Sequence, residues 1–242
     1  MRVLFISDLH LQPQCPHGCQ LFSHFLECLA PQAEVLYILG DLFEYWVGDD
    51  HNNFFIKQMK KQLHALGKSD TALKLMVGNR DFLLGQEFAT AVGATLLTDP
   101  TCIDLFGKKT LLMHGDSLCS NDKQFMAYLQ KIRDPLFQKR VLAYPLWLRL
   151  SLAKLFRLRS RFHNRHLPRE FFEVNYKTLQ QLMVQHQAQQ VIHGHIHRPG
   201  IHLSLDFDRY VLSDWRDQGN YLLCSDNHSP QLKYISLTSR TL

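Results

Sequence analysis

The chain has 242 residues, 45% of them hydrophobic, and its formal net charge of +5 at pH 7 makes it mildly basic. Its longest uncharged apolar run in the middle, VLAYPLWL, is far below the ~20 residues of a membrane span. The apolar run in MRVLFISDLH is too short for a signal peptide, and the six cysteines are too scattered for a disulfide framework. We therefore expect a cytosolic protein, or one attached to a membrane surface from the cytosol, with one large domain or one domain carrying an insertion.

Five short apolar runs predict buried strands, and each is followed at once by polar residues. In chain order they are VLFIS (3–7), VLYIL (35–39), LKLMV (73–77), TLLM (110–113) and VI (191–192). The helix-like segments QLFSHFLECL and FIKQMKKQLHAL lie between the early strands, so the pattern predicts an α/β fold, a sheet with helices on its faces. DLFGKKTLLM predicts a hairpin that turns at Gly107. The runs IHLSL, YVLSDW, NYLLC and QLKYISL, after His197, indicate an antiparallel set.

The polar residues at the strand ends form a recognisable ligand set. They are Asp8, His10, Asp41, Asn79, His114, His195 and His197. In sheets of this kind, ligands bind beyond the carboxyl ends of the strands. Carboxylate, amide and imidazole without thiolate suit Mn²⁺, Fe²⁺ or Zn²⁺ better than a structural zinc site. Seven ligands are too many for one ion with an open position, so we expect two ions bridged by one carboxylate, as phosphoester cleavage requires.

The motifs D-x-H, G-D, G-N-x-D, H-G-D and G-H-x-H, in this order, resemble those of the calcineurin-like metallophosphoesterases. That resemblance implies a β-sandwich flanked by helices, with a two-metal site at the strand ends. It implies one ion held by Asp8, His10, Asp41 and His197, and a second held by Asp41, Asn79, His114 and His195. Asp41 would bridge the two ions. His193 has no ligand role in this pattern, so we interpret it as a packing residue or a neighbour of the ligands.

Arg80 departs from the general family pattern, in which a catalytic histidine follows Gly-Asn. The chain reads GNRD at this point. Arginine cannot act as a general acid near neutral pH, but its planar fork is well suited to hold a phosphate. A nucleotide is a good leaving group that needs little general-acid help, so Arg80 indicates a pyrophosphate bond rather than an alkyl phosphate ester.

The segment 135–169 carries nine Lys or Arg and no Asp or Glu, and its basic residues alternate with Leu, Phe, Trp and Tyr. One interpretation is a helical hairpin with a solvated basic face. The other is an amphipathic cap that meets anionic lipid headgroups and admits acyl chains on its apolar side. We expect a core of residues 1–120 and 170–242 with a helical cap insertion of residues 121–169.

Over nearly its whole length the chain resembles the UDP-2,3-diacylglucosamine pyrophosphatases of lipid A biosynthesis. The likeness includes YILGDLFEYWVGDD, GNRDFLLG, LMHGDSLC, the leucine-rich basic insertion and HGHIHRPG. It implies hydrolysis of the pyrophosphate bond of UDP-2,3-diacylglucosamine by water attack on the α-phosphorus. The implied products are UMP and 2,3-diacylglucosamine 1-phosphate (lipid X). The resemblance also implies two Mn²⁺ ions and a peripheral protein on the cytoplasmic face of the inner membrane.

The same resemblance implies which residues contact the substrate. They are Asn79, Arg80, Asp122, Ser160, Asn164 and His195, of which Asn79, Arg80 and His195 would be catalytic. Ser160 and Asn164 are four residues apart, so on a helix they face the same way. Asp122, in SNDK, has a helix N-cap as its alternative role. Related proteins carry Lys at the position of Leu167, which puts that substrate contact in doubt.

Two other functions are compatible with the motifs. The first is a phosphoesterase acting on nucleic acid, such as a nuclease, whose basic insertion would hold the phosphate backbone. The apolar residues between the bases argue against it. The second is a metallophosphoesterase-like scaffold without activity, which should have lost ligands, whereas all seven ligands are present.

Overall fold

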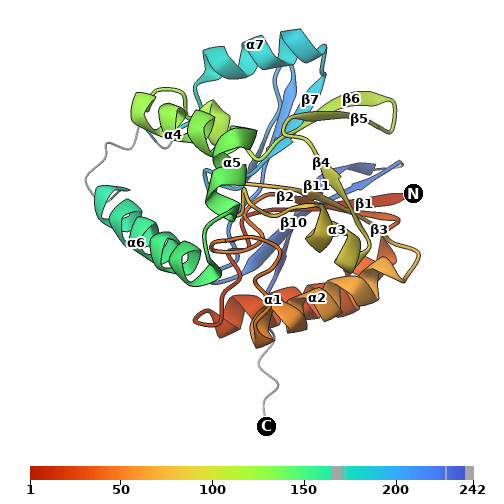
Figure 1. Ribbon diagram of the computed structural model, residues 1–242. Helices are drawn as coiled ribbons and strands as arrows, with labels where there is room; N and C mark the ends of the chain where they lie inside the picture. Colours follow the sequence, from red (N-terminus) through yellow and green to blue (C-terminus); the bar gives the residue numbers. More distant parts are fainter. Residues whose placement is uncertain (165–170, 172, 227, 238–242) are drawn as a thin grey trace.

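The computed structural model describes residues 1–164, 171, 173–226 and 228–237, with side chains up to residue 160 in the first range (Figure 1). Its strands form two sheets. The six-stranded sheet has the order β11-β10-β1-β2-β3-β4. Its strands are β1 (Arg2–Ile6), β2 (Val35–Leu39), β3 (Ala72–Met76), β4 (Ala94–Leu97), β10 (Gly219–Ser225) and β11 (His228–Ile235). β1 to β4 are parallel, and β10 is antiparallel to both β1 and β11.

The five-stranded sheet has the order β5-β6-β7-β9-β8. Its strands are β5 (Thr101–Leu105), β6 (Lys108–Leu112), β7 (Gln190–His193), β8 (Gly200–His202) and β9 (Asp208–Val211). β6, β7 and β9 are parallel, whereas β5 and β8 are antiparallel to their neighbours. β5 and β6 form the predicted hairpin, and Phe106 and Gly107 at its turn have φ values of +55° and +81°, as a tight hairpin requires.

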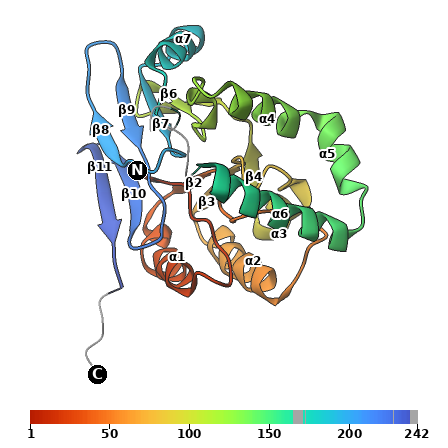
Figure 2. The same ribbon diagram turned by 90° about the vertical axis from the view of Figure 1, so that its left-hand side faces the viewer.

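Helices cover the outer faces of both sheets (Figures 1 and 2). α1 (Pro16–Cys28), α2 (Phe54–Gly67) and α3 (Gln86–Val92) pack on the first sheet, and α7 (Tyr176–His186) packs on the second. Between β6 and β7, the chain forms α4 (Lys123–Arg133), α5 (Pro135–Leu142) and α6 (Leu146–Asn164). Two short 3-10 turns, η1 (Ala30–Gln32) and η2 (Asp116–Leu118), complete the described elements. Among the described helices, none combines the length and hydropathy needed to cross a bilayer.

The two faces of β1 explain why its sequence is apolar throughout. Val3 and Phe5 point into a core between the two sheets, where they meet residues such as Leu112 of β6. Leu4 and Ile6 point the other way, into the core beneath α1, α2 and α3. A strand buried on both faces has no polar alternation, because successive side chains enter different cores. The two facing sheets and their flanking helices confirm the predicted fold class.

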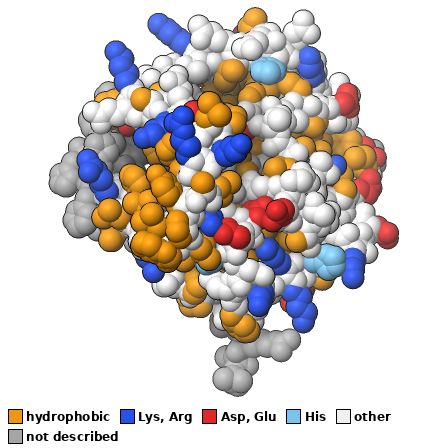
Figure 3. Space-filling view, in the orientation of Figure 1, with side chains coloured by type: hydrophobic (Ala, Val, Ile, Leu, Met, Phe, Trp, Pro, Cys, Tyr) orange, Lys and Arg blue, Asp and Glu red, His pale blue; other side chains and the backbone are white. Residues whose placement is uncertain are grey.

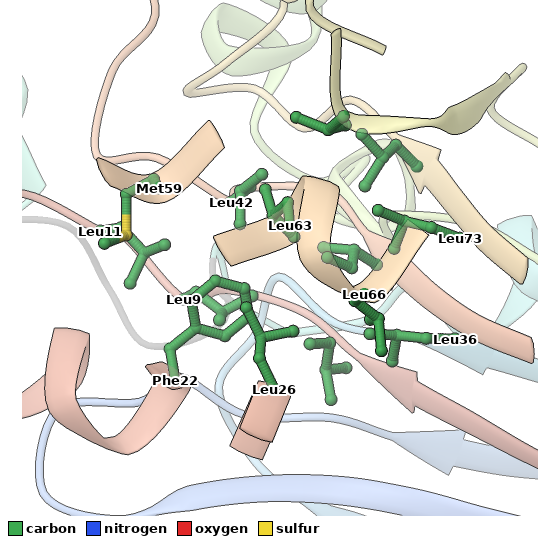
Figure 4. Packing of buried hydrophobic residues seen from close by; sticks show 14 of the residues in the cluster. Leu9, Leu11, Phe22, Leu26, Leu36, Leu42, Met59, Leu63, Leu66 and Leu73 are labelled. Carbon is green, nitrogen blue, oxygen red and sulfur yellow. The ribbon is translucent and has the colours of Figure 1, made fainter. Parts of the chain in front are cut away.

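The helix-covered core is visible in Figure 4, where leucines from the helices and strands interdigitate. α2 illustrates why its sequence forms a helix there. Asn53 caps its start by accepting a hydrogen bond from the Ile56 N–H at 2.9 Å. Ile56, Met59 and Leu63 then recur at three- and four-residue spacing and lie buried on one face.

The four runs after His197 do not form one antiparallel set, and that prediction is wrong in this respect. β8 and β9 belong to the five-stranded sheet, whereas β10 and β11 belong to the six-stranded sheet. IHLSL is also too long, because the strand ends at His202 and Ser204 bonds with both backbone groups of Phe207. An alternating apolar pattern indicates a pleated, half-buried segment, but it does not specify which strand will be its partner.

Candidate metal centre

The ends of five strands deliver the predicted ligands to one place. β1 leads to Asp8 and His10, β2 to Asp41, and β3 to Asn79. From the second sheet, β6 leads to His114 and β7 leads to the loop that carries His195 and His197. The backbones of the first two loops are joined, because the Asp8 N–H donates to Gly40 O at 3.1 Å and the His10 N–H donates to Asp41 O at 3.0 Å. The structure therefore brings ligands that lie 189 positions apart in the printed sequence into one cluster.

The backbone is strained at five of the seven predicted ligands. They have positive φ values, namely Asp8 (+55°), His10 (+49°), Asp41 (+53°), His195 (+68°) and His197 (+52°). A non-glycine residue in this left-handed region costs about 1–3 kcal/mol and persists only where its surroundings enforce it. Such strain concentrates at functional sites, so its occurrence at these five residues indicates that their side chains must point in fixed directions.

Two groups of side chains have the spacing of metal ligands. In the first, Asp8, His10 and His197 each offer one atom within 4.8 Å of the others. His10 Nε2 and His197 Nε2 are 3.3 Å apart, and Asp8 Oδ1 is 3.3 Å from His197 Nε2. Asp8 is held in place by Ser7 Oγ and the His195 N–H, which both donate to its Oδ2.

The second group consists of Asp41, His114 and His195, again with one atom each within 4.8 Å of the others. His195 Nδ1 is 3.3 Å from His114 Nε2, and Asn79 Oδ1 is 3.1 Å from the same nitrogen. Asp41 Oδ2 lies 3.6 Å from His114 Nε2 and 3.9 Å from His10 Nε2, between the two groups. This is the position that a bridging carboxylate would occupy.

Two glycines in the motifs are needed because the chain approaches the carboxylates closely. A Cβ at Gly78 would lie 2.2 Å from Asp41 Oδ1, and one at Gly194 would lie 2.1 Å from Asp8 Oδ2. Neither carboxylate could keep its position beside a larger residue. The glycines of GNRD and GHIH therefore belong to the geometry of the site.

The chemistry of the donors fits divalent ions. Ring nitrogens from different histidines face each other at 3.3 Å in both groups, an arrangement that is explained when the nitrogens share an ion. The remaining donors are carboxylate and amide oxygens, and no described cysteine lies in either group. Imidazole and oxygen donors suit divalent ions such as Mn²⁺, Fe²⁺ or Zn²⁺.

Residues outside the predicted set orient the ligands. His114 Nδ1 lies 2.9 Å from Leu39 O, which can only accept, so Nδ1 carries a hydrogen and Nε2 faces the site. Asp81 is buried and accepts from the N–H groups of Leu42 and Gly78 at 2.8 and 2.7 Å, which joins the loops after β2 and β3. Asp81 is the Asp of the motif G-N-x-D, so the sequence carried a signal for it, although no role was predicted for it.

Glu44, Asp214 and Arg133 also support the site and were missed. Glu44 Oε2 lies 3.5 Å from His10 Nδ1, and Asp214 Oδ2 lies 3.6 Å from His197 Nδ1. Arg133, from α4, bonds to both Asp99 and Asp116 near His114. The sequence offers little signal for these residues, because each acts through a partner that is distant in the chain.

The residues expected to contact substrate have different surroundings. Arg80 lies beside the second group. Its side-chain Nε is 3.8 Å from Asp41 Oδ2, and its backbone N–H donates to Asp41 Oδ1 at 2.8 Å. Asp122 caps α4 by accepting from the Phe125 N–H at 2.9 Å, so the alternative role considered for it is observed. Ser160 lies on α6 and is half-buried. The side chain of Asn164 and all of Leu167 lie outside the described residues.

Two further side chains lie next to the ligands of the loop after β7. The Phe125 ring of α4 stacks on the His195 imidazole with centroids 5.6 Å apart, so α4 reaches the site. His193 is fully buried, and burial lowers its pKa to about 4. Its Nδ1 lies 3.0 Å from Gly194 O, and it belongs to neither ligand group.

Without an ion, the second group holds protons. Burial raises the pKa of Asp41 to about 7. Burial disfavours the charged form of His114, but the nearby carboxylates of Asp41 and Asp8 outweigh it and raise the pKa of His114 to about 9. A metal ion needs the deprotonated carboxylate and a neutral imidazole, so it must displace these protons.

Metal affinity should therefore rise with pH between 6 and 8. His114 is protonated throughout this range because its pKa is above it, and Asp41 loses its proton near the middle. Each displaced proton should increase the apparent affinity by up to about tenfold per pH unit. Isothermal titration of the metal-free protein with Mn²⁺ in buffers of different ionisation enthalpy would measure the proton release. Affinity that is constant from pH 6 to 8 would contradict the prediction.

Known proteins resemble the chain over most of its length. A sequence model of the calcineurin-like phosphoesterase family matches residues 1–199, the range that contains all seven predicted ligands. A UDP-2,3-diacylglucosamine hydrolase of Coxiella burnetii is 44% identical over 97% of this chain and 98% of that protein. A protein of the same name from Histophilus somni is 40% identical over 93% of this chain and 97% of its own length. Another, from Chromohalobacter salexigens, is 41% identical over 99% of this chain and 100% of its own length. Among solved structures, an archaeal phosphodiesterase has a TM-score of 0.49 and 11% identity, over 97% of this chain and 100% of that chain.

Proposed function

The chain belongs to the calcineurin-like phosphoesterase family, and we propose that it hydrolyses the pyrophosphate bond of UDP-2,3-diacylglucosamine. The proposed products are UMP and 2,3-diacylglucosamine 1-phosphate (lipid X), an intermediate of lipid A biosynthesis. One observation carries the proposal: two groups of metal-type ligands meet at Asp41, beside helices whose exposed surface is apolar and basic. The name shared by the curated relatives supplies the substrate.

We propose that the site holds two Mn²⁺ ions. Asp8, His10, Asp41 and His197 would hold one, and Asp41, Asn79, His114 and His195 would hold the other, so that Asp41 would serve both. Bound divalent ions would supply hydroxide at neutral pH and would neutralise charge on the phosphoryl oxygens. The chain's own contribution is to fix the directions of the ligands. Strained backbone, the buried carboxylate of Asp81 and the Leu39 carbonyl all serve this purpose.

Arg80 is proposed to hold the phosphate that remains on the sugar. Its Nε is buried without a hydrogen-bond partner among the described residues and lies 3.8 Å from the Asp41 carboxylate. A buried guanidinium nitrogen with an unused hydrogen is well suited to a phosphoryl oxygen, and two parallel bonds would fix its orientation. Asn79 and His195 are proposed to contact the same phosphate from the other side of the second group.

We propose that α4, α5 and α6 belong to a cap, within the segment 121–169, that receives the lipid. Hydrophobic side chains gather over α6 and the end of α5, with Lys and Arg side chains around them (Figure 3). Trp147 and Leu158 are 67% and 55% exposed, and their spacing of eleven residues puts them on one face of α6. This face is suited to anionic headgroups and acyl chains, which supports a peripheral site on the cytoplasmic face of the inner membrane.

Replacing both Trp147 and Leu158 with glutamate should weaken binding to vesicles that contain anionic lipid. Burying each side chain in a membrane is worth about 1.5–3 kcal/mol, so the loss should exceed tenfold. Co-sedimentation with vesicles measures it. Val184→Glu on α7, where the side chain is 78% exposed, is the matched control and should bind as the native chain does. If Val184→Glu weakened vesicle binding as much as the α6 variant, the face of α6 would not be the membrane-binding surface.

The position of attack can be tested with ¹⁸O-labelled water. The proposal expects the label in UMP, because water would attack the α-phosphorus next to uridine. Label in the lipid phosphate would contradict attack on the α-phosphorus but would leave the proposed substrate unchanged.

The nuclease alternative has its own test. Cleavage of a DNA or RNA oligonucleotide with no cleavage of the lipid would favour it, and binding of the oligonucleotide would weaken steeply with salt.

A further inference from the structure

Glu44 connects the first group of ligands to the helix α6. It follows the β2 loop, is 7% exposed, and has carboxylate contacts on two sides. On one side, Oε2 lies 3.5 Å from His10 Nδ1. On the other, Oε1 accepts from the guanidinium of Arg157, with Nε at 2.9 Å. A single buried carboxylate therefore lies between a predicted metal ligand and α6.

The geometry assigns different tasks to the two ring nitrogens of His10. Nε2 faces the site, 3.3 Å from His197 Nε2 and 3.9 Å from Asp41 Oδ2. Nδ1 is buried, and the acidic group beside it is Glu44. A histidine that binds metal through one nitrogen carries its hydrogen on the other and usually donates it to a carboxylate or carbonyl. Glu44 is placed to accept that hydrogen from His10.

We propose that Glu44 is a positioning residue that couples metal binding at the group of Asp8, His10 and His197 to the attachment of α6. The inference rests on the proposed two-metal site. When Arg157 holds the carboxylate in place, Glu44 favours the His10 tautomer with a free Nε2, ready for an ion. By reciprocity, an ion on Nε2 favours the position of Glu44 that Arg157 binds, and so favours the attached state of α6. Because α6 also carries Ser160, this coupling would reach the residues proposed to contact the lipid.

Two neighbouring carboxylates provide controls. Glu44 contacts both a ligand histidine and an arginine of α6, whereas each of these carboxylates has only one of those two contacts. Asp214 lies 3.6 Å from His197 Nδ1 in the same ligand group, but its arginine partner is Arg216 at 3.0 Å, outside α6. Arg149 attaches the beginning of α6 to Asp50 and to the Val47 carbonyl. Asp50 belongs to neither ligand group.

The test variant is Glu44→Gln, which keeps the shape of the side chain and removes its charge. Mn²⁺ titration of the metal-free protein should show one of two ions bound about 10–100-fold more weakly than in the native chain. Hydrogen exchange of the amides of α6 gives a second measurement that does not depend on activity. In the native chain Mn²⁺ should slow this exchange, and in Glu44→Gln the slowing should be lost. Arg157→Met should have the same two effects, and the double variant should be no worse than either single variant.

The controls separate coupling from general damage. Asp214→Asn should weaken one ion while Mn²⁺ still slows exchange in α6. Asp50→Asn should speed exchange in α6 at unchanged Mn²⁺ affinity. The inference is overturned if Glu44→Gln binds two ions as tightly as the native chain. It is also overturned if Mn²⁺ slows hydrogen exchange in α6 equally in the native chain and in Glu44→Gln. A native chain that binds no Mn²⁺ would instead overturn the two-metal proposal on which the inference rests.

Discussion

Replacing Asp41 with alanine is expected to abolish hydrolysis and to release most of the bound metal. Asp41 Oδ2 lies between the two groups, within 4 Å of a histidine nitrogen from each. Because Asp41 would bind both ions, its removal should weaken the binding of both. Without the ions to stabilise charge on the phosphoryl oxygens, kcat/KM should fall by at least about 10³-fold. Elemental analysis of the purified protein gives the metal content, and release of UMP gives the rate.

Asp70→Ala is the matched control for Asp41→Ala, because Asp70 is an exposed carboxylate in the loop after α2. It should keep both the native metal content and the native rate. If Asp41→Ala retained two ions per chain, Asp41 would not be the bridge. Folding of the variant should be checked by circular dichroism, since removing Asp41 also removes the acceptor of the Arg80 N–H.

Replacing Arg80 with alanine should lower turnover by about 10²–10³-fold while leaving the metal content unchanged. Removing one hydrogen-bond donor that stabilises developing charge in a preorganised site typically lowers kcat by about this factor. Arg80 contributes no ligand atom to either group, so the ions should remain. Steady-state kinetics and elemental analysis of the same preparation test both parts.

Arg80→Lys distinguishes the charge of Arg80 from its shape. Lysine keeps the positive charge but loses the planar fork, so this variant should recover only part of the activity. Arg159→Ala on α6, where the side chain is exposed, is the control for the loss of a basic residue from the cap outside the metal site. Loss of metal in Arg80→Ala would mean that Arg80 is structural and does not act on the substrate.

The ligands were predictable from the sequence because each follows an apolar run directly. Asp8 and His10 come after a strand buried on both faces, and His114 comes after another. Within each sheet, parallel strands bring their ends to the same edge, so the ligands of β1, β2 and β3 had to lie near one another. That the ends of β6 and β7, in the other sheet, meet them depends on how the two sheets face each other, which the sequence pattern does not specify. The strain at Asp8 and Asp41 was not predictable, because positive φ values depend on how neighbouring loops pack.

The residues that support the ligands could not be predicted in the same way. Glu44 reads as one more acid in a loop, and its partner Arg157 is 113 residues away. Asp122 has a local signal, SNDK, that identifies a helix cap but does not say whether its carboxylate also meets substrate. The sequence pattern could not predict which strands pair with β8 and β10, because apolar residues alternate in the same way in either sheet.

The proposed reaction can be measured by incubating the purified protein with UDP-2,3-diacylglucosamine in detergent micelles, with and without Mn²⁺. We expect UMP release that depends on Mn²⁺, together with an equal amount of 2,3-diacylglucosamine 1-phosphate. Failure to cleave this lipid while an artificial phosphodiester is still hydrolysed would contradict the assigned substrate and leave only the phosphoesterase site.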